Sequence, residues 1–229
     1  MMPDRIVDFH EPVTLLGGGT ANARQLRHVL SLAPWLIAAD GGANMAVAEG
    51  LIPDVVIGDF DSALPGTLAA IPADRHMQVP EQESTDFEKC LMRITAPLIL
   101  GLGFLGPRAD HTLAVFSALV RYPGKPCLLI GEKDVIFAAP RRLSLDLPPA
   151  TRLSLFPMIP VRGESLGLRW PIDGLQMAPD GRIGTSNETT GPVTLHLSGP
   201  GMLVILPVAE LAAAISALRS GPGVPAGAG

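Results

Sequence analysis

Short apolar runs alternate with amphipathic segments over the first 140 residues of the chain. The apolar runs carry few polar side chains, as expected for strands that are buried on both faces of a sheet. They cover residues 13–16, 35–39, 55–57, 97–100 and 127–130, and helix-compatible patterns cover residues 21–32, 43–49, 86–94 and 110–121. This alternation predicts an α/β domain over residues 1–140, with a mostly parallel, Rossmann-like sheet and right-handed crossovers.

Two of the predicted helices begin with residues that favour a helix start. Thr85 and Glu88 have the spacing of a capping box, and Asp86 lies in the first turn between them. Asp110 is placed to act as the N-cap of the helix that follows it.

The pattern changes near residues 139–142. From there we expect short strands separated by Pro and Gly at residues 143–147, 151–156, 167–170, 193–197 and 202–206, with one helix at 208–218. Such strands favour a small antiparallel sandwich or barrel, placed here at residues 141–219. Residues 184–188 are expected to form a polar turn, and the Pro/Gly-rich tail over residues 220–229 is expected to be disordered.

The composition excludes several classes of function. The net charge is −5 and aromatic residues make up 4% of the chain, so neither a nucleic-acid-binding face nor a base-stacking platform is expected. An acidic protein that handles phosphates needs a bound cation to offset the repulsion. Pro207 and Glu210 interrupt the most apolar stretch, so no membrane contact is expected. We predict a cytoplasmic protein without a secretory signal, with Cys90 and Cys127 as buried free thiols.

Two glycine-rich segments each follow a predicted strand. Gly17, Gly18 and Gly19 precede a helix, where glycine lets the backbone approach a phosphate. The segment matches neither a dinucleotide-binding fingerprint nor a P-loop. Asp40 and Gly41 follow the next strand, at the sheet edge where α/β proteins bind ligands. Taken singly, each segment is also compatible with a tight turn or, for Asp40, a helix N-cap.

Asp59 and Asp61 follow the strand at residues 55–57. In an extended backbone, residues two apart face the same way at about 6–7 Å, so their carboxylates repel each other unless a cation lies between them. Mg²⁺ with polyphosphate oxygens meets that need. Gly58, just before the pair, leaves room for a ligand. The sequence therefore favours a metal site here over two solvated loop aspartates.

Polar residues near the last two predicted helix starts extend this site. Asp86 is a candidate third metal carboxylate, and Lys89 is either a phosphate contact or a solvated helix lysine. Arg108 offers a planar fork that fits phosphate. Asp110 caps its helix or accepts a hydrogen bond from substrate, and His111 on its own is compatible with a structural role. Four strand ends that carry glycine or aspartate thus converge in the first half of the chain.

Together these segments resemble the thiamine pyrophosphokinase family, bacterial type. The resemblance rests on DGGAN at 40–44, PDVVIGDFDS at 53–62, QESTDFEKCL at 82–91, GPRADHTLA at 106–114, GLRWPI at 167–172 and GTSNE at 184–188. It implies an α/β domain that binds ATP and a C-terminal β-sandwich that binds thiamine and dimerises. It also implies a homodimer with the active site at the subunit interface.

The resemblance implies roles for individual residues. Mg²⁺ would be held by Asp59, Asp61 and Asp86, which with Arg108 and Asp110 form the catalytic group. ATP would be bound by Gly18, Asp40, Gly41, Gln82, Lys89 and His111. Thiamine would be bound by Asp110, Ser186 and Asn187.

The implied activity is that of a kinase-type transferase in thiamine diphosphate biosynthesis. The pyrophosphoryl group of ATP passes to the thiamine hydroxyl, giving thiamine diphosphate and AMP. The proton acceptor is Asp110 or a metal-bound aspartate, and the residues do not choose between them. Three alternatives are a pyrophosphokinase for another hydroxymethyl heterocycle such as a pterin, a nucleotide-sugar transferase, and a non-catalytic nucleotide or thiamine sensor.

Overall fold

The computed structural model describes residues 6–220, and their contacts group into two compact units. Unit 1 contains the described residues up to Ala118 together with Lys125–Gly131. Unit 2 contains Leu119–Gly124 together with the described residues from Glu132 onward. The division at residue 140 into ATP-binding and thiamine-binding domains stays a prediction. The tail predicted to be disordered lies outside the described residues, except for Ser220.

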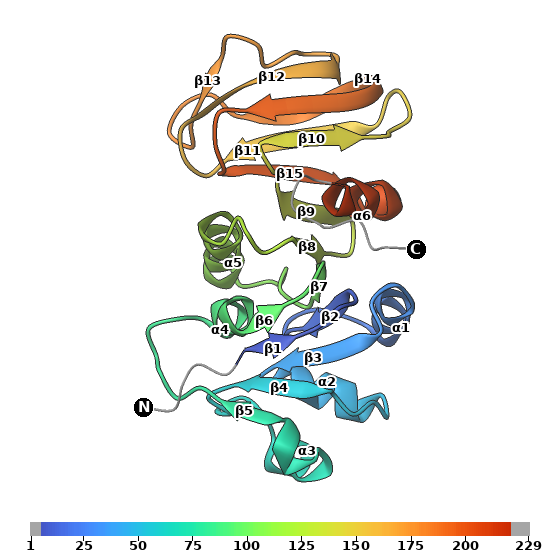
Figure 1. Cartoon of the computed structure of the whole chain (residues 1–229), viewed down its shortest axis with the longest axis vertical. Helices are drawn as coiled ribbons and strands as arrows, with labels where there is room; N and C mark the ends of the chain where they lie inside the picture. Colours follow the sequence, from blue (N-terminus) through green and yellow to red (C-terminus); the bar gives the residue numbers. More distant parts are fainter. Residues whose placement is uncertain (1–5, 221–229) are drawn as a thin grey trace. The chain divides into compact units, whose positions relative to one another are not determined.

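Unit 1 is built on a parallel sheet with the strand order β8-β7-β2-β3-β4-β5 (Figure 1). These strands are β2 (Val13–Leu16), β3 (Trp35–Ala39), β4 (Val55–Gly58), β5 (His76–Gln78), β7 (Ile99–Leu102) and β8 (Cys127–Ile130), while β1 (Val7–Asp8) and β6 (Ile94–Thr95) form a separate parallel pair. Every residue of β2, β4, β7 and β8 is buried. Burial on both faces explains why these strands have continuous apolar sequences.

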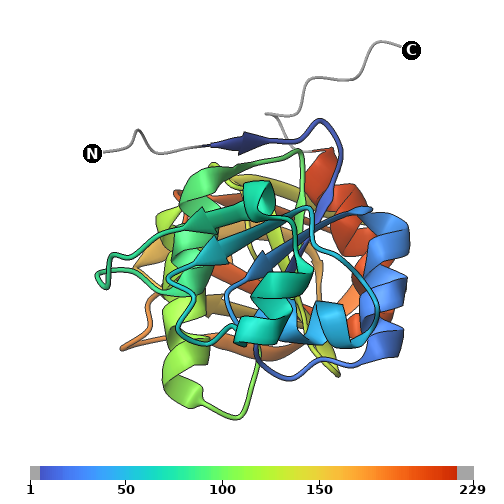
Figure 2. The ribbon, with the colours of Figure 1, turned by 90° about the horizontal axis from the view of Figure 1, so that it is seen from below.

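Helices cover both faces of this sheet. Helix α4 (Asp86–Arg93) lies on one face and α1 (Ala23–Leu32) on the other (Figures 1 and 2). The remaining elements of this part of the chain are α2 (Gly42–Ala48), α3 (Pro65–Ala70), the 3-10 turn η1 (Ala73–Arg75) and α5 (Ala109–Arg121). Helix α1 follows β2 and α2 follows β3, while the loops that lead to α4 and α5 follow β5 and β7. All four segments therefore leave the sheet at its carboxyl edge.

The helix starts depend on local caps. Thr85 caps α4, because its hydroxyl accepts a hydrogen bond from the Glu88 N–H at 3.3 Å. Helix α5 begins at Ala109, so Asp110 lies in the first turn and its predicted N-cap role is wrong. Asn22 and Gln25 form a complete reciprocal capping box at α1, which fixes where the chain leaves the glycine-rich segment after β2.

Unit 2 is an antiparallel arrangement organised by one long strand, β14 (Gly184–Leu197). The first part of β14 pairs with β11 (Arg152–Pro157), which pairs in turn with β15 (Met202–Pro207), and β15 pairs with β9 (Asp134–Ala138). The last part of β14 pairs with both β10 (Arg142–Leu145) and β12 (Val161–Leu168), and β12 also pairs with β13 (Gln176–Met177). The turn η2 (Val208–Glu210) and helix α6 (Leu211–Arg219) follow β15.

Two predictions for unit 2 need correction. Residues 184–188 were expected to form a turn, but they open β14, because their backbone pairs with β11. Of the strand predicted at 167–170, only Gly167 and Leu168 are in a strand, where they end the longer β12, and buried and exposed positions are mixed along β12. The coarse prediction is confirmed: the N-terminal part is parallel α/β and the C-terminal strands are antiparallel.

Both cysteines are buried free thiols, as predicted. Burial raises the pKa of the Cys90 and Cys127 thiols, so both stay protonated and unreactive at neutral pH. No helix within residues 6–220 combines the length and apolar character needed to cross a bilayer.

Candidate active site

A cavity of about 660 Å³ opens at the carboxyl edge of the unit 1 sheet. The segments after β2, β3, β4 and β7 line it, together with the first turns of α4 and α5. Open α/β sheets bind ligands at this edge, because loop amides and helix N-termini meet there. The predicted site residues that line it are Gly18, Gly41, Asp59, Asp61, Gln82, Asp86, Lys89, Arg108 and His111.

Glycines allow two loops to approach each other closely beside the cavity. The Gly19 N–H donates to the Gly103 carbonyl at 2.9 Å. A Cβ on Gly103 would lie 2.5 Å from the Gly17 carbonyl oxygen, and Gly103 itself has φ +79. The glycines after β2 therefore serve the packing of the cavity wall, in addition to any contact with a ligand.

Asp59 and Asp61 lie in the loop after β4. Phe60 between them has φ +70, so the backbone turns here and the expectation of an extended pair is wrong. The turn gathers carboxylate oxygens of Asp40, Asp59 and Asp61 within 4.8 Å of one another. The Phe60 ring packs against a buried apolar cluster and meets His76 edge-on, with ring centroids 5.7 Å apart. These contacts hold the left-handed turn in place.

Asp40 supports the same loop from inside the protein, where it is fully buried. Its Oδ2 accepts a hydrogen bond from the Phe60 N–H at 2.9 Å, and its Oδ1 accepts one from the Ser62 N–H at 3.2 Å. Gly58 permits this approach, because a Cβ there would lie 2.7 Å from the Asp40 Cβ. Asp40 lies beneath the cavity lining, and its role as a nucleotide contact stays a prediction.

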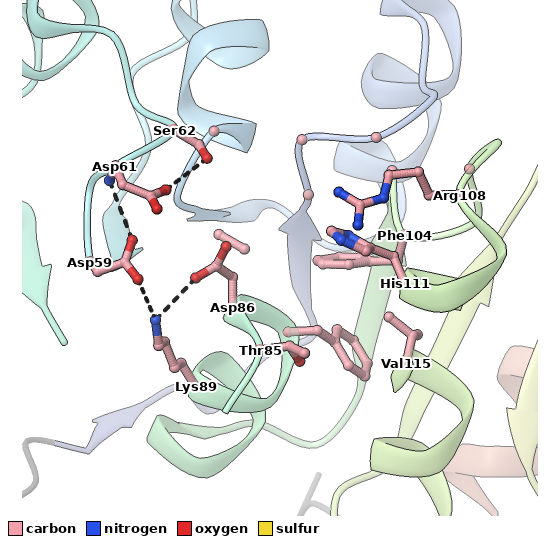
Figure 3. Close-up of a pocket in the computed structure, with 18 of the residues that line it drawn as sticks. Asp59, Asp61, Ser62, Thr85, Asp86, Lys89, Phe104, Arg108, His111 and Val115 are labelled. Carbon is pink, nitrogen blue, oxygen red and sulfur yellow. Dashed lines mark hydrogen bonds and ion pairs between the residues drawn. The ribbon is translucent and has the colours of Figure 1, made fainter. Parts of the chain in front are cut away.

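Lys89 links the acidic loop to α4. Its side chain is only 2% exposed, and Nζ pairs with Asp59 at 2.8 Å and with Asp86 at 3.4 Å (Figure 3). The Gln82 amide donates to the same Asp59 carboxylate at 2.8 Å. A buried ammonium group needs charged partners of this kind. Lys89 is therefore an internal counter-ion and not a solvated helix lysine.

The carboxylates of the cavity differ in their electrostatic state. The hydrogen bond from Lys89 holds the pKa of Asp59 well below its usual range. Burial, a hydrogen bond with Asp59 and the charge of Asp86 together raise the pKa of Asp40 to about 6. Burial also raises the pKa of Asp86, against the opposing effect of Lys89. The site therefore carries more negative charge than Lys89 alone offsets, and a divalent cation would relieve it.

We expect the metal-free protein to lose stability as the pH rises between about 4 and 6. Asp40 has a pKa of about 6 in the folded protein against a usual value of 3.8, so over this interval the folded state binds more protons than the unfolded state. Stability then falls with rising pH, and the pKa of Asp86 is shifted in the same direction. Urea unfolding in EDTA at stepped pH measures the slope. Asp86→Asn should flatten it, and a slope of opposite sign would contradict the assignment.

Arg108 and Asp110 form an exposed ion pair beside the cavity. The guanidinium donates from Nε and Nη2 to the two carboxylate oxygens, at 3.2 and 2.6 Å. These hydrogen bonds lower the pKa of Asp110 to about 2. Arg108 and His111 line the cavity and Asp110 does not. Because exposed ion pairs are weak, Arg108 can exchange its partner for a phosphate.

The cavity has two chemically distinct sides. In Figure 3 the acidic residues and Lys89 lie on one side, and Phe104, His111 and Arg108 lie on the other. The Phe104 ring packs against Phe87 with centroids 4.7 Å apart. One side can therefore bind a cation, and the other offers an aromatic surface with a cationic donor.

The donor set fits magnesium. All donors are carboxylate oxygens, which Mg²⁺ prefers, and opposite ligands of an octahedral Mg²⁺ lie about 4.2 Å apart. The oxygens of Asp40, Asp59 and Asp61 gather within 4.8 Å, close to that span. Asp86 is not in this group and lies against Lys89 instead. The assignment of Asp86 as a metal ligand stays a prediction.

Ser186 and Asn187 lie in unit 2, whereas all residues that line the cavity lie in unit 1. Ser186 is exposed with φ +58, and its N–H donates to the Ser154 hydroxyl at 3.0 Å. Asn187 is buried and holds the backbone of Trp170, because it accepts from the Trp170 N–H at 3.2 Å and donates to the Trp170 carbonyl at 2.7 Å. The thiamine-binding roles of Ser186 and Asn187 stay predictions.

Among the cavity-lining residues that sequence reasoning had not singled out are Asn44, Ser62 and Phe104. Asn44 and Ser62 stand in the DGGAN and DFDS segments, so their neighbouring aspartates are the available signal. Phe104 contacts Phe87, which is distant in sequence. A contact of that kind leaves no local pattern, and the glycines around Phe104 are the only hint.

Comparison with known proteins points to one family. Residues 26–129 match the family described as "Thiamin pyrophosphokinase, catalytic domain", and this segment contains Asp59, Asp61, Asp86 and Lys89. Over this segment the chain matches the thiamin pyrophosphokinase family. Thiamin pyrophosphokinase 1 of Caenorhabditis elegans is 26% identical over 198 residues, covering 78% of this chain and 81% of the relative. Thiamine pyrophosphokinase 1 of Oryza sativa subsp. japonica is 29% identical over 186 residues, covering 66% and 70%.

Solved structures share the fold of this chain. The thiamin pyrophosphokinase from Candida albicans superposes with a TM-score of 0.73 at 16% identity, covering 90% of this chain and 94% of that one. The thiamin pyrophosphokinase from Geobacillus thermodenitrificans gives 0.69 at 22% identity, with 86% and 96% covered. At these identities the likeness shows the fold, a parallel α/β part followed by antiparallel strands.

Proposed function

We infer that the protein is an ATP-dependent thiamine diphosphokinase. One observation carries this conclusion: the segment that matches the thiamin pyrophosphokinase catalytic domain supplies the acidic side of the unit 1 cavity. In the reaction, a bond forms between the thiamine hydroxyl oxygen and the β-phosphorus of ATP. The bond from that phosphorus to the oxygen bridging the α-phosphorus breaks, and AMP leaves. The hydroxyl proton passes to a base, and the products are thiamine diphosphate and AMP.

Magnesium is proposed to bind at Asp59 and Asp61, with Asp40 and Asp86 as neighbouring carboxylates. When bound, the ion supplies charge neutralisation to the polyphosphate. The contribution of the protein is a site that is already assembled. Lys89 and Gln82 each bind the Asp59 carboxylate at 2.8 Å. The carboxylate is therefore already oriented before substrate binds.

Arg108 is proposed to leave Asp110 and bind the phosphate groups of ATP. Its fork fits phosphate oxygens as well as it fits a carboxylate. Once Arg108 has moved to the phosphates, the Asp110 carboxylate no longer has the partner that lowers its pKa to about 2. Asp110 then becomes a better base. Asp110 and a metal-bound aspartate remain the two alternatives for accepting the hydroxyl proton.

The remaining nucleotide contacts are proposed from the cavity wall. Gly18 and Gly41 expose backbone at the carboxyl ends of β2 and β3, and Gln82 and His111 line the same cavity. The aromatic side at Phe104 offers an apolar surface for a base, opposite the carboxylates that attract a cation. ATP can therefore place its polyphosphate and its base in chemically matched surroundings.

Thiamine is proposed to bind with help from unit 2. Its thiazolium ring is a cation, which suits an acidic cavity. We propose that the antiparallel strands form a small sandwich, and that two copies of the chain form a homodimer in which Ser186 and Asn187 reach thiamine. A cytoplasmic location is proposed with it, because the reaction consumes ATP.

The Ser186→Ala variant tests the proposed thiamine contact. We expect the KM for thiamine to rise several-fold more than the KM for ATP, because the hydroxyl contacts thiamine alone in this proposal. Steady-state kinetics with each substrate varied in turn measures both constants. The Ser220→Ala variant, an exposed serine at the end of α6, is the matched control. Equal effects on the two substrates would count against the placement of Ser186.

Phosphorus NMR with ATP, Mg²⁺ and thiamine tests the reaction itself. AMP and thiamine diphosphate in equal amounts would establish attack at the β-phosphorus. Turnover with a pterin or another hydroxymethyl heterocycle, but not with thiamine, would replace the substrate and keep the metal site. Absence of turnover with any alcohol would favour a binding protein, and consumption of a nucleotide sugar would favour a glycosyl transferase.

A further inference from the structure

Two side chains from the segment after β3 form hydrogen bonds with the backbone of the loop that carries Asp59 and Asp61. The Asn44 Nδ2 donates to the Ser62 carbonyl at 2.9 Å, and Oδ1 accepts from the Leu64 N–H at 2.9 Å. Asp40 accepts from the N–H groups of Phe60 and Ser62. Asp40 and Asn44 therefore satisfy four backbone groups between residues 60 and 64, and we call this arrangement the loop clamp.

The Asn44 part of the loop clamp lies in a helix that is packed against the sheet. Asn44 belongs to α2, which packs on β2 and β3 through the fully buried residues Ala43 and Ala46. The Asn44 N–H donates to the Gly41 carbonyl at 3.1 Å, so the first turn of α2 is itself closed. Because α2 is fixed to the sheet, the position of the Asn44 amide is set before any ligand binds.

The chemistry of the clamp requires an amide at residue 44. A carboxylate only accepts hydrogen bonds, so Asp40 can hold N–H groups and no carbonyl. An asparagine amide donates and accepts at once, and it alone holds both the Ser62 carbonyl and the Leu64 N–H. Asparagine also has low helix propensity, so its position inside α2 is not explained by helix formation.

We propose that Asn44 is a positioning residue for the proposed reaction, whose amide fixes the loop that carries Asp59 and Asp61 and thereby sets the affinity for Mg²⁺. The proposal rests on the proposed function, because it assumes that this loop binds the metal. Residues that orient metal ligands commonly change metal affinity by about 10- to 100-fold when they are replaced. Asn44 meets that description, since it holds the loop backbone at Ser62 and Leu64, directly after Asp61.

Three variants and one control separate positioning from general stability. Asn44→Ala removes both hydrogen bonds, and Asn44→Asp keeps the acceptor for the Leu64 N–H but turns an oxygen toward the Ser62 carbonyl. Asn44→Gln keeps the amide on a longer arm and serves as a second test if the alanine variant does not fold. Asn22→Ala is the matched control, because it removes the capping box of α1 and Asn22 does not line the cavity.

Mg²⁺ binding by calorimetry and amide hydrogen exchange are the two readouts. We expect Asn44→Ala to bind Mg²⁺ about tenfold more weakly, with faster exchange at Ser62 and Leu64, and Asn44→Asp and Asn44→Gln to be weakened as well. Asn22→Ala should lower Tm and leave both readouts at the wild-type value. Unchanged Mg²⁺ affinity or unchanged exchange in Asn44→Ala, or an equal loss in Asn22→Ala, would overturn the proposal. Neither readout needs turnover, so wild type without AMP formation would reject the proposed function separately.

Discussion

An Asp61→Asn variant should lose activity by roughly a hundredfold or more, since replacing even a residue that only orients a metal ligand costs up to about that much. The change is nearly isosteric and removes one negative charge from the group that Asp61 forms with Asp40 and Asp59. Folding should be preserved, because Asp61 is exposed and its carboxylate accepts a hydrogen bond from the hydroxyl of the neighbouring Ser62 at 2.8 Å. The expected loss is therefore one of Mg²⁺-dependent catalysis and not of structure.

The AMP formation rate at saturating ATP and thiamine, measured across a Mg²⁺ titration, checks this result. Asp74→Asn is the matched control, because Asp74 is an exposed aspartate in η1 that does not line the cavity. Its rate and Tm should stay near the wild-type values. Normal turnover in Asp61→Asn would show that the metal is held elsewhere, whatever the behaviour of the control.

A Lys89→Met variant should be less stable than wild type by about 3 kcal/mol, the usual result when one partner of a buried ion pair is removed. Methionine fills a similar volume but leaves Asp59 without its positively charged partner. The side chain of Asp59 is 12% exposed and that of Asp86 is 39% exposed, so most of the effect should come from Asp59. Added Mg²⁺ should recover part of the loss, because it restores positive charge between the carboxylates.

Urea unfolding with and without Mg²⁺ measures the stability of this variant. Lys133→Met, at an exposed lysine of unit 2, is the matched control and should change stability by less than about 0.5 kcal/mol. The double variant Lys89→Met/Asp59→Asn should be more stable than Lys89→Met alone, because it removes the orphaned charge. Equal stability of wild type and Lys89→Met would mean that the ion pair contributes nothing to folding.

Strands buried on both faces were the most predictable part of the fold. The ranges predicted at residues 13–16, 35–39 and 127–130 coincide with β2, β3 and β8, because a continuous apolar run leaves few other choices in an α/β protein. Elements stabilised mainly by partners were missed. Strand β5 has only three residues, and strand β9 has five and pairs with the distant strand β15. Residues 184–188 read as a polar turn, because only the pairing with β11 makes them a strand.

For the site, the sequence indicates which residues meet but not how they meet. Asp59 and Asp61 could be selected by their spacing, whereas the left-handed turn at Phe60 that gathers them depends on packing against distant residues. Asp40 reaches Phe60 and Ser62 across about twenty residues of sequence. Lys89 could be judged buried only once α4 was docked beside β4. Long-range hydrogen bonds and ion pairs of this kind leave no trace in local periodicity.

Strand β14 has a consequence for how unit 2 comes apart. The first part of this fourteen-residue strand pairs with β11, and its last part pairs with a second group of strands, β10 and β12. If β11 separates from β14, or if β10 and β12 do, then β14 loses part of the pairing that holds it in place, and the remaining strands depend on that same strand. The two groups are therefore expected to open together as one cooperative unit, without a partly unfolded form in which one of them survives.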